Sequence, residues 1–337
     1  MNKEKDKIIS KETKVSFEKM IPKINYIDKE FDNFNNKNLI KPNFRKYVSP
    51  NNFTKTNYAY SSLIFADESY IPSLLVLGYS IKSNNNKFNL ICMVQDKPTT
   101  VIINNEEKYF PGVSKNSIDN ILKIYDVVYG IDLIQTDSYK FKEHFTDVFK
   151  HYKNISIYPT KLQSFGLIDY QRILFLDASL VINKNIDYLF DIYDDYTFLI
   201  DSFTDITGMG TRGSVFLIKP TLKLYNKALF LSKYYKQIFK NLFFSRGIDE
   251  MLIFFTVYPN WSKKLIKLWT SCIEKYLFKK CPIYHYQIYK PFKEFENKPN
   301  NEITFKLWDF YAKKLLHKYP EYNVYFQHIK NIRNVDY

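Results

Sequence analysis

The chain has 337 residues and a formal net charge of +14, and its 45% apolar content suffices for a substantial core. Such a length fits one large α/β domain with an N-terminal extension. Three cysteines without CxxC spacing exclude a disulfide framework and a cysteine-based zinc site, and they indicate a reducing compartment. The lysines are spread along the whole chain, so a solvated basic surface explains the charge better than nucleic-acid binding does.

The N-terminal segment is charged and polar. Residues 1–55 are rich in Lys, Asn and Glu, which predicts a flexible or loosely docked extension. The segment has no apolar core of the kind that a signal peptide needs. No apolar run in the chain is long enough to cross a bilayer. We therefore expect a soluble, cytoplasmic protein without a membrane span.

From Tyr58 onward, apolar runs alternate with segments of helical periodicity. Strands are expected over 58–66, 88–94, 126–129, 172–177, 197–200 and 215–218. Helices are expected over 70–81, 117–125, 160–168, 222–236 and 248–257. This alternation predicts an α/β domain with a mainly parallel, doubly wound sheet over residues 56–293. An amphipathic helix through Trp308 and Leu315 predicts a helical C-terminal extension over 294–337.

The tripeptide Asp177-Ala178-Ser179 follows the expected strand that begins at Arg172. A carboxylate at the C-terminal end of a parallel strand points into the crevice where α/β proteins bind ligands. Many nucleotide-sugar enzymes carry two carboxylates there, spaced Asp-x-Asp, which hold a divalent cation on a diphosphate. Here Asp177 has the first position and Ser179 the second. Alone, a strand that ends in Asp most often marks only a turn, so further signals are needed.

Further segments support the tripeptide by their order along the chain. They are YAYSSLIFADESYIPSLLVLGYSI at 58–81, TKLQSFGLIDYQRILFLDASLVINKNIDYLFD at 160–191, RGSVFLIKP at 212–220, DEML at 249–252 and HYQIYKPF at 285–292. Each is a weak signal, but order and spacing make the set specific. Over residues 57–292 the chain resembles the glycogenin-like family 8 glycosyltransferases. The resemblance implies a GT-A fold and a hexosyltransferase. Such an enzyme moves a hexose, expected to be glucose, from a UDP-sugar to an acceptor hydroxyl with retention of configuration.

The resemblance implies a nucleotide site from four matching residues. Asp67 and Tyr70 match the turn that holds uridine, Lys161 matches a basic residue near the nucleotide, and Lys290 matches the lysine that faces the diphosphate. Each also has a plain structural interpretation. Asp67 suits a turn, Tyr70 suits a packed aromatic at a helix start, and the lysines suit a solvated surface.

The same resemblance implies a metal site for Mn²⁺ or Mg²⁺. Asp177 matches the carboxylate that in the family binds the first metal position and the ribose of the nucleotide-sugar, while His285 matches a late metal ligand. Ser179 replaces the second carboxylate, and a hydroxyl is a weaker ligand for cations that prefer charged oxygen atoms. A lone histidine is more often packed or exposed at the surface, but Lys290-Pro291 follows His285 at the family spacing.

Four further residues are candidates for catalysis. Asp249 matches the carboxylate near the transferred sugar, and Glu250 replaces a glutamine of the family. Arg212 replaces an asparagine and could supply positive charge to phosphate in a bidentate contact. Glu250 and Asp201 are the candidates for a second catalytic carboxylate, although both also suit a solvated surface.

Two functions from different classes follow from these signals. The first is an active transferase with a UDP-sugar donor and an acceptor that is a protein, a glycan or the chain itself. The alternative is a catalytically weak or inactive relative that binds nucleotide-sugar and acts as a binding protein, which the replacement at Ser179 favours. A nucleic-acid partner rests on charge alone and is not expected. A homodimer is an open alternative.

Overall fold

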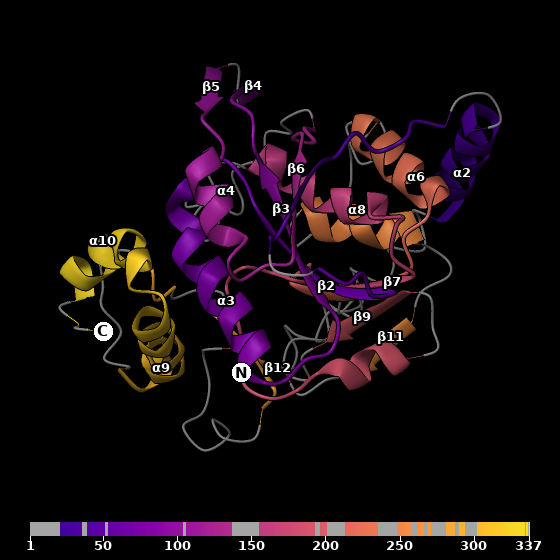
Figure 1. Ribbon diagram of the computed structural model, residues 1–337. Helices are drawn as coiled ribbons and strands as arrows, with labels where there is room; N and C mark the ends of the chain where they lie inside the picture. The colour runs from indigo at the N-terminus through magenta and orange to yellow at the C-terminus, as the bar shows by residue number, and fades with distance from the viewer. Residues whose placement is uncertain are drawn as a thin grey trace, which may run out of the picture.

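The computed structural model describes residues 21–35, 39–50, 53–103, 106–136, 155–192, 196–200, 213–234, 248–257, 262–265, 268–270, 281–286, 290–293 and 302–333, with Val335 and Tyr337. Its centre is an eight-stranded sheet (Figure 1). In spatial order the strands are β1 Arg45–Val48, β6 Val127–Ile131, β3 Asn89–Gln95, β2 Tyr58–Ile64, β7 Arg172–Leu176, β10 Val215–Ile218, β9 Tyr196–Ile200 and β11 Ser262–Leu265.

The middle of this sheet is parallel. Strands β6, β3, β2 and β7 run in one direction, and β11 runs parallel to β9 at the far edge. β1 and β10 run antiparallel to the parallel strands beside them, and β9 runs antiparallel to β10. All seven residues of β3 are buried, as is typical of parallel strands that are covered on both faces. The expected mainly parallel, doubly wound sheet is confirmed.

Alternate side chains of the strands enter two separate cores, because successive residues of a strand point to opposite faces. Tyr60, Leu90 and Leu174 belong to the core on one face, whereas Ala59 and Ile91 belong to the core on the other. The first core includes residues of α3 Ile71–Ser83, α4 Lys115–Ile121, α9 Glu302–Lys318, η6 Pro320–Tyr322 and α10 Asn323–Arg333. The second includes residues of the 3₁₀ segment η3 Ile155–Gly166, α6 Leu222–Lys233 and α8 Ile248–Val257.

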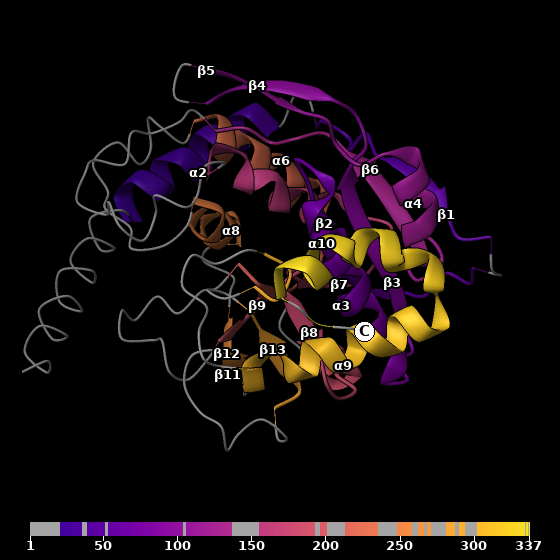
Figure 2. The same ribbon diagram turned by 90° about the vertical axis from the view of Figure 1, so that its left-hand side faces the viewer.

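The C-terminal helices lie against the first face. Both α9 and α10 contact α3, and the two views agree on this placement (Figures 1 and 2). Trp308 of α9 is completely buried between the two helices and contacts Phe326 of α10 with a ring separation of 5.8 Å. The amphipathic helix that the sequence predicts there is confirmed. No helix in the described parts of the chain is both long and apolar enough to cross a membrane.

Several short elements were not expected from the sequence. A three-stranded sheet contains β12 Leu268–Thr270, β13 Ile283–His285 and β8 Leu180–Ile182, in that order. A hairpin of β4 Thr99–Ile103 and β5 Glu106–Phe110 projects from the domain (Figure 1). Two 3₁₀ turns, η1 Glu68–Tyr70 and η4 Asp187–Asp191, follow β2 and β8. The helix expected over 160–168 is instead the 3₁₀ segment η3, which begins earlier and contains Pro159, a residue that cannot donate a backbone hydrogen bond.

Part of the expected N-terminal extension has regular structure. α2 Ile21–Asn35 contacts α6, and its Phe31 is buried with a ring separation of 5.7 Å from Phe230. β1 is an outer strand of the central sheet, where Arg45 pairs with Asp96. Residues 1–20 lie outside the described residues, and the domain boundaries at 55 and 293 remain a prediction.

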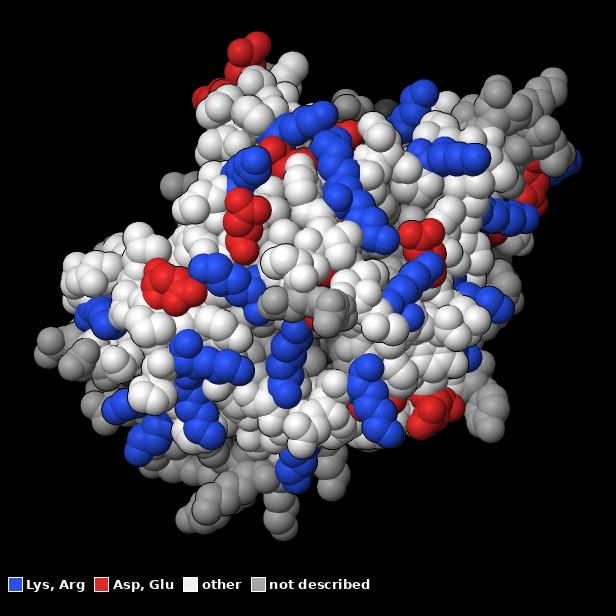
Figure 3. Space-filling view, viewed as in Figure 1, with Lys and Arg blue, Asp and Glu red and all other residues white. Residues whose placement is uncertain are grey.

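The basic residues do not gather in one place on the face that Figure 3 shows. Lysine and arginine side chains are scattered over it, with acidic side chains between them (Figure 3). A nucleic-acid-binding protein typically concentrates its positive charge in a patch or stripe. On this face the positive charge is therefore dispersed.

Candidate functional site

The site lies where parallel strands end. β2 and β7 are parallel neighbours with Ser61 opposite Phe175, so the turns that follow them meet at one edge of the sheet. Asp67 follows the end of β2, and Asp177 follows β7 directly. The backbone N–H of Asp177 donates to the carbonyl of Ser214 at 2.8 Å, which fixes the start of this turn against β10. This edge is where α/β sheets bind ligands.

The turn after β2 contains a strained residue. Ala66 has a φ of 77°, a left-handed conformation that is uncommon for residues other than glycine. Its backbone N–H donates to Oε1 of Gln95 at 2.9 Å, and its carbonyl accepts from the N–H of Gly112 at 3.3 Å. Strain of this kind persists where neighbouring structure fixes it, and it clusters at functional sites. It directs the chain so that the exposed Asp67 carboxylate caps η1, accepting from the N–H of Ser69 at 2.9 Å.

Asp177 has positive neighbours on several sides. Nζ of Lys161 lies 3.4 Å from its Oδ2, and the backbone N–H and hydroxyl of Ser179 donate to its Oδ1 at 3.0 and 2.6 Å. Burial alone would raise the pKa of Asp177. The charges of Lys161, Lys290 and His285, with the Ser179 hydrogen bond, outweigh burial and lower this pKa well below its usual range. The carboxylate therefore stays ionised at any physiological pH.

A second group of cations surrounds Tyr70. Nζ of Lys290 donates to the Tyr70 hydroxyl at 3.1 Å, and Nζ of Lys293 lies 4.3 Å from the centre of its ring. Burial would raise the pKa of Tyr70, but Lys290 and Lys293 outweigh it and lower the pKa. Asp177 also acts electrostatically on Tyr70, so the two groups form one cluster. Sequence reasoning missed Lys293, whose only signal is its place three residues after Lys290.

Two hydrogen bonds to backbone carbonyls hold the turn that carries Asp177. The hydroxyl of Ser73 on α3 donates to the carbonyl of Ala178 at 2.7 Å, and the N–H of Tyr286 donates to the carbonyl of Ser179 at 3.1 Å. The second contact belongs to the pairing of β13 with β8. This pairing brings the buried His285, which is 7% exposed, into the neighbourhood of Asp177. Residues far apart in the sequence therefore meet at one turn.

The metal site implied by the resemblance is incomplete. In the described part of the chain, no group of three His, Cys, Asp or Glu side chains could hold a metal ion. Ser179 donates its hydroxyl proton to Asp177, and Lys161 pairs with the other oxygen of that carboxylate. Hard divalent cations prefer several oxygen ligands, mostly carboxylates. Asp177, Ser179 and His285 do not fit such a cation as they stand.

The candidate catalytic residues are not placed. Arg212 and Asp201 lie outside the described residues. Asp249 and Glu250 stand in the first turn of α8, but their side chains are outside the described part of the structure. The roles of these four residues therefore remain predictions.

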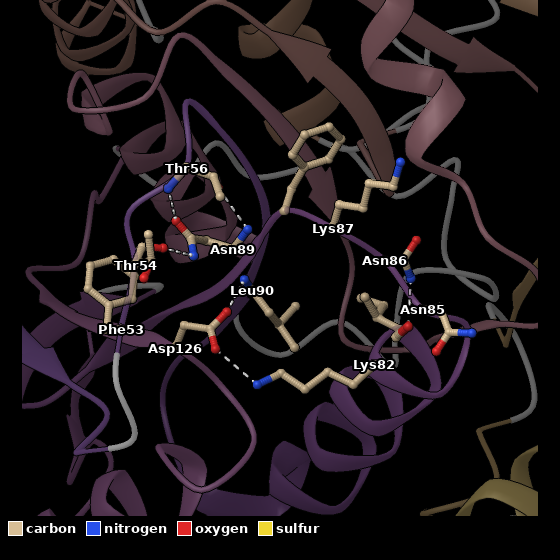
Figure 4. A pocket seen from close by; sticks show the side chains of 12 residues that line it. Phe53, Thr54, Thr56, Lys82, Asn85, Asn86, Lys87, Asn89, Leu90 and Asp126 are labelled. Carbon is tan, nitrogen blue, oxygen red and sulfur yellow. Dashed lines mark hydrogen bonds and ion pairs between the residues drawn. The ribbon is translucent and has the colours of Figure 1, made fainter.

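A separate cavity of about 530 Å³ lies at the other edge of the sheet (Figure 4). Asn89, which begins β3, belongs to its wall, whereas Gln95 at the end of β3 supports the turn near Asp67. Several polar groups of the cavity are engaged with one another. Asp126 pairs with Lys82 at 2.9 Å, and Asn89 accepts from the N–H of Thr56 at 2.6 Å (Figure 4). This cavity is distinct from the Asp177 site.

No family model matches the chain. An uncharacterised protein of Acanthamoeba polyphaga mimivirus is 28% identical over 140 residues, which cover 41% of each chain. The galactosyltransferase LgtC, solved with donor and acceptor sugar analogues, is similar in structure with a TM-score of 0.51 and 12% identity. That match covers 79% of this chain and 99% of LgtC. The glycosyltransferase GlyE of Streptococcus pneumoniae has a TM-score of 0.47 and 14% identity, with 78% of this chain and 64% of GlyE covered.

The chain thus spans less than two thirds of the mimivirus relative and of GlyE. At these identities the structural likeness establishes the fold alone. The likeness to LgtC extends over 99% of that chain and includes the region of the central sheet of this one. The fold of this chain is therefore of the GT-A glycosyltransferase type.

Proposed function

We propose that the chain is a glycosyltransferase that moves a hexose, expected to be glucose, from a UDP-sugar to an acceptor hydroxyl with retention of configuration. One observation carries the proposal. Asp177 ends a parallel strand of a GT-A sheet and lies among Lys161, Lys290 and His285. An ionised carboxylate among cations, at the ligand-binding edge of such a sheet, suits a nucleotide diphosphate attached to a sugar.

The cations match the main electrostatic need of this reaction. The diphosphate gains negative charge as its bond to the sugar breaks, so positive groups fixed beside it stabilise the transition state. Lys161 and Lys290 supply such groups, since Lys161 is anchored by Asp177 at 3.4 Å and Lys290 by Tyr70 at 3.1 Å. In this proposal Asp67 and Tyr70 hold the uridine, and Asp177 positions the lysines and contacts the nucleotide-sugar.

The sugar and the acceptor concern residues beyond the described side chains. We assign to Asp249 the hydroxyls of the transferred sugar, to Glu250 a carboxylate beside the reacting carbon, and to Arg212 a contact with phosphate. The acceptor is a protein, a glycan or the chain itself. Participation of Mn²⁺ or Mg²⁺ is a separate prediction, which the assay below examines with each cation and with chelator.

A second function has its own support. The Ser179 hydroxyl, which stands where the family has a metal carboxylate, donates a 2.6 Å hydrogen bond to Asp177. This replacement favours a relative that binds nucleotide-sugar without turnover. The two functions differ in product formation and agree in nucleotide binding.

The test combines a mass measurement with a binding measurement. The protein is incubated with a panel of UDP-sugars in Mn²⁺, Mg²⁺ or EDTA, with and without candidate acceptors. UDP release and the intact mass of the protein are then recorded. UDP release together with a hexose increment on the protein or the acceptor supports the transferase. Calorimetric binding of UDP without release from any donor supports the binding protein. Absence of UDP binding contradicts both.

Variants locate the activity at this site. Lys290→Ala is expected to weaken UDP binding by roughly 1.5–3 kcal/mol, because a charge-assisted contact with phosphate is lost. Asp67→Ala is expected to weaken it as well, and UDP is expected to bind more tightly than GDP. Lys87→Met, in the cavity at the opposite edge of the sheet, is the matched control and should leave binding unchanged. Equal loss in Lys290→Ala and Lys87→Met would contradict the assignment.

A further inference from the structure

We infer that the donor diphosphate is held by the ammonium groups of Lys161, Lys290 and Lys293 in place of a divalent cation. The inference rests on the proposed function, because it concerns how the same site holds its UDP-sugar. It adds Lys293 to the site as a phosphate-binding residue.

Both carboxylate oxygens of Asp177 already have partners. Oδ1 accepts from the N–H and the hydroxyl of Ser179, and Oδ2 pairs with Lys161 at 3.4 Å. A cation bound at Asp177 would have to displace these partners. The second position of the motif offers a hydroxyl, which brings no negative charge to attract the cation. The carboxylate therefore serves as an anchor for Lys161.

Tyr70 lies beside two ammonium groups that belong to one short segment. Nζ of Lys290 is 3.1 Å from the Tyr70 hydroxyl, and Nζ of Lys293 is 4.3 Å from the centre of its ring. The ring of Phe292 between them packs on Tyr70 at a centroid separation of 5.1 Å, which holds the segment in place. An ammonium has three donors, so a lysine bonded to Tyr70 keeps the capacity to donate to phosphate. Tyr70 thus holds both lysines at one place, and Lys290 also acts electrostatically on Asp177.

The three ammonium groups of Lys161, Lys290 and Lys293 outnumber the carboxylate of Asp177 that anchors one of them. This excess of positive charge suits a nucleotide diphosphate without a cation. A site with two carboxylates is negatively charged and repels the diphosphate, so it needs a divalent cation between the carboxylates and the phosphates. The hydroxyl of Ser179 in place of a second carboxylate and the ammonium of Lys293 both shift the charge of the site toward positive.

The experiment measures UDP binding by calorimetry in EDTA, in Mg²⁺ and in Mn²⁺. For the wild type we expect dissociation constants within about threefold of one another, because the fixed cations suffice. Lys293→Met is expected to weaken binding in EDTA by about tenfold or more, since a charged contact is lost. Lys87→Met is the control variant, and it should leave the dissociation constant of UDP unchanged. Thermal unfolding of each variant checks that the fold is kept.

Ser179→Asp provides the complementary measurement. Its second carboxylate should repel the diphosphate, so binding in EDTA should weaken and Mn²⁺ should restore it by about tenfold. The variant would thus depend on the cation where the wild type does not.

Three outcomes would overturn the inference. The first is wild-type binding of UDP that Mn²⁺ tightens by tenfold or more. The second is UDP binding by Lys293→Met that equals that of the wild type. The third is UDP binding by Ser179→Asp that is as tight in EDTA as in Mn²⁺. If UDP binds without metal but no sugar is transferred, the inference holds and the transferase proposal fails. If UDP binds in no condition, both fail.

Discussion

Replacement of Gly130 by alanine is expected to destabilise the fold strongly. A Cβ atom at this position would lie 2.0 Å from Oδ2 and 2.3 Å from Cγ of Asp96. That carboxylate is not able to move aside at low cost. It accepts from Nε of Arg45 at 2.8 and 2.9 Å and from the hydroxyl of Tyr47 at 2.8 Å, and it is 3% exposed. Asp96 follows Gln95, which holds the turn at Ala66, so this network supports the candidate site.

The magnitude follows from what the clash would break. To accept the methyl group, Asp96 must leave Arg45 and Tyr47. Removal of one partner from a buried ion pair costs about 3–5 kcal/mol, and the lower end applies here because Arg45 is 21% exposed. We therefore expect Gly130→Ala and Asp96→Ala each to lower the free energy of unfolding by about 3 kcal/mol. The double variant should also lose only about 3 kcal/mol, since without the carboxylate there is no clash.

Urea unfolding followed by circular dichroism measures the four proteins of this cycle. Gly78→Ala combined with Asp96→Ala is the control, because the close neighbours of Gly78 are Tyr125 and Ile124. That pair should be additive. A double Gly130→Ala/Asp96→Ala variant that loses the sum of the single effects, about 6 kcal/mol, would refute the reasoning. A Gly130→Ala protein as stable as the wild type would refute it as well.

Three further predictions concern other parts of the molecule. Burial would raise the pKa of Asp96, but hydrogen bonds from Arg45 and Tyr47 outweigh it and lower this pKa. The wild type should therefore have a higher free energy of unfolding than Asp96→Asn, and this difference should reach its full size above about pH 4. It should then disappear as the pH falls through the folded pKa; urea unfolding from pH 7 to pH 2.5 measures this, and a constant difference would contradict it. Ser73→Ala removes the 2.7 Å hydrogen bond to the Ala178 carbonyl and should lower the free energy of unfolding by about 1–3 kcal/mol. It should also weaken UDP binding, and an unchanged affinity for UDP would show that this bond does not position the site. Trp308→Ala should lower the free energy of unfolding by about 3–5 kcal/mol and expose the C-terminal helices to proteolysis. A decrease below about 1 kcal/mol would mean that these helices are not part of the core.

The local order of the sequence determined much of the fold. The runs that form β2, β3 and β7 are apolar and bounded by polar turns, so they indicate buried strands whatever their partners are. The position of Asp177 after β7 follows from the same local pattern, and with the parallel sheet it indicates the ligand-binding edge. Short strands such as β8 and β13 have three residues each and carry too few positions for a pattern.

The family resemblance assigned Tyr70 and Lys290 to one site, and the tertiary structure decided which side chains touch. Lys290 lies 220 residues from Tyr70 in the sequence, yet its ammonium donates to the tyrosine hydroxyl. Local periodicity contains no information about such a contact, because it depends on the pairing of β13 with β8. The same holds for Asp96, which follows a parallel strand as Asp177 does but pairs with Arg45 of the outer strand β1. Two carboxylates with similar local sequence settings thus differ because one is enclosed by a neighbouring strand, while the other stays partly exposed among lysines.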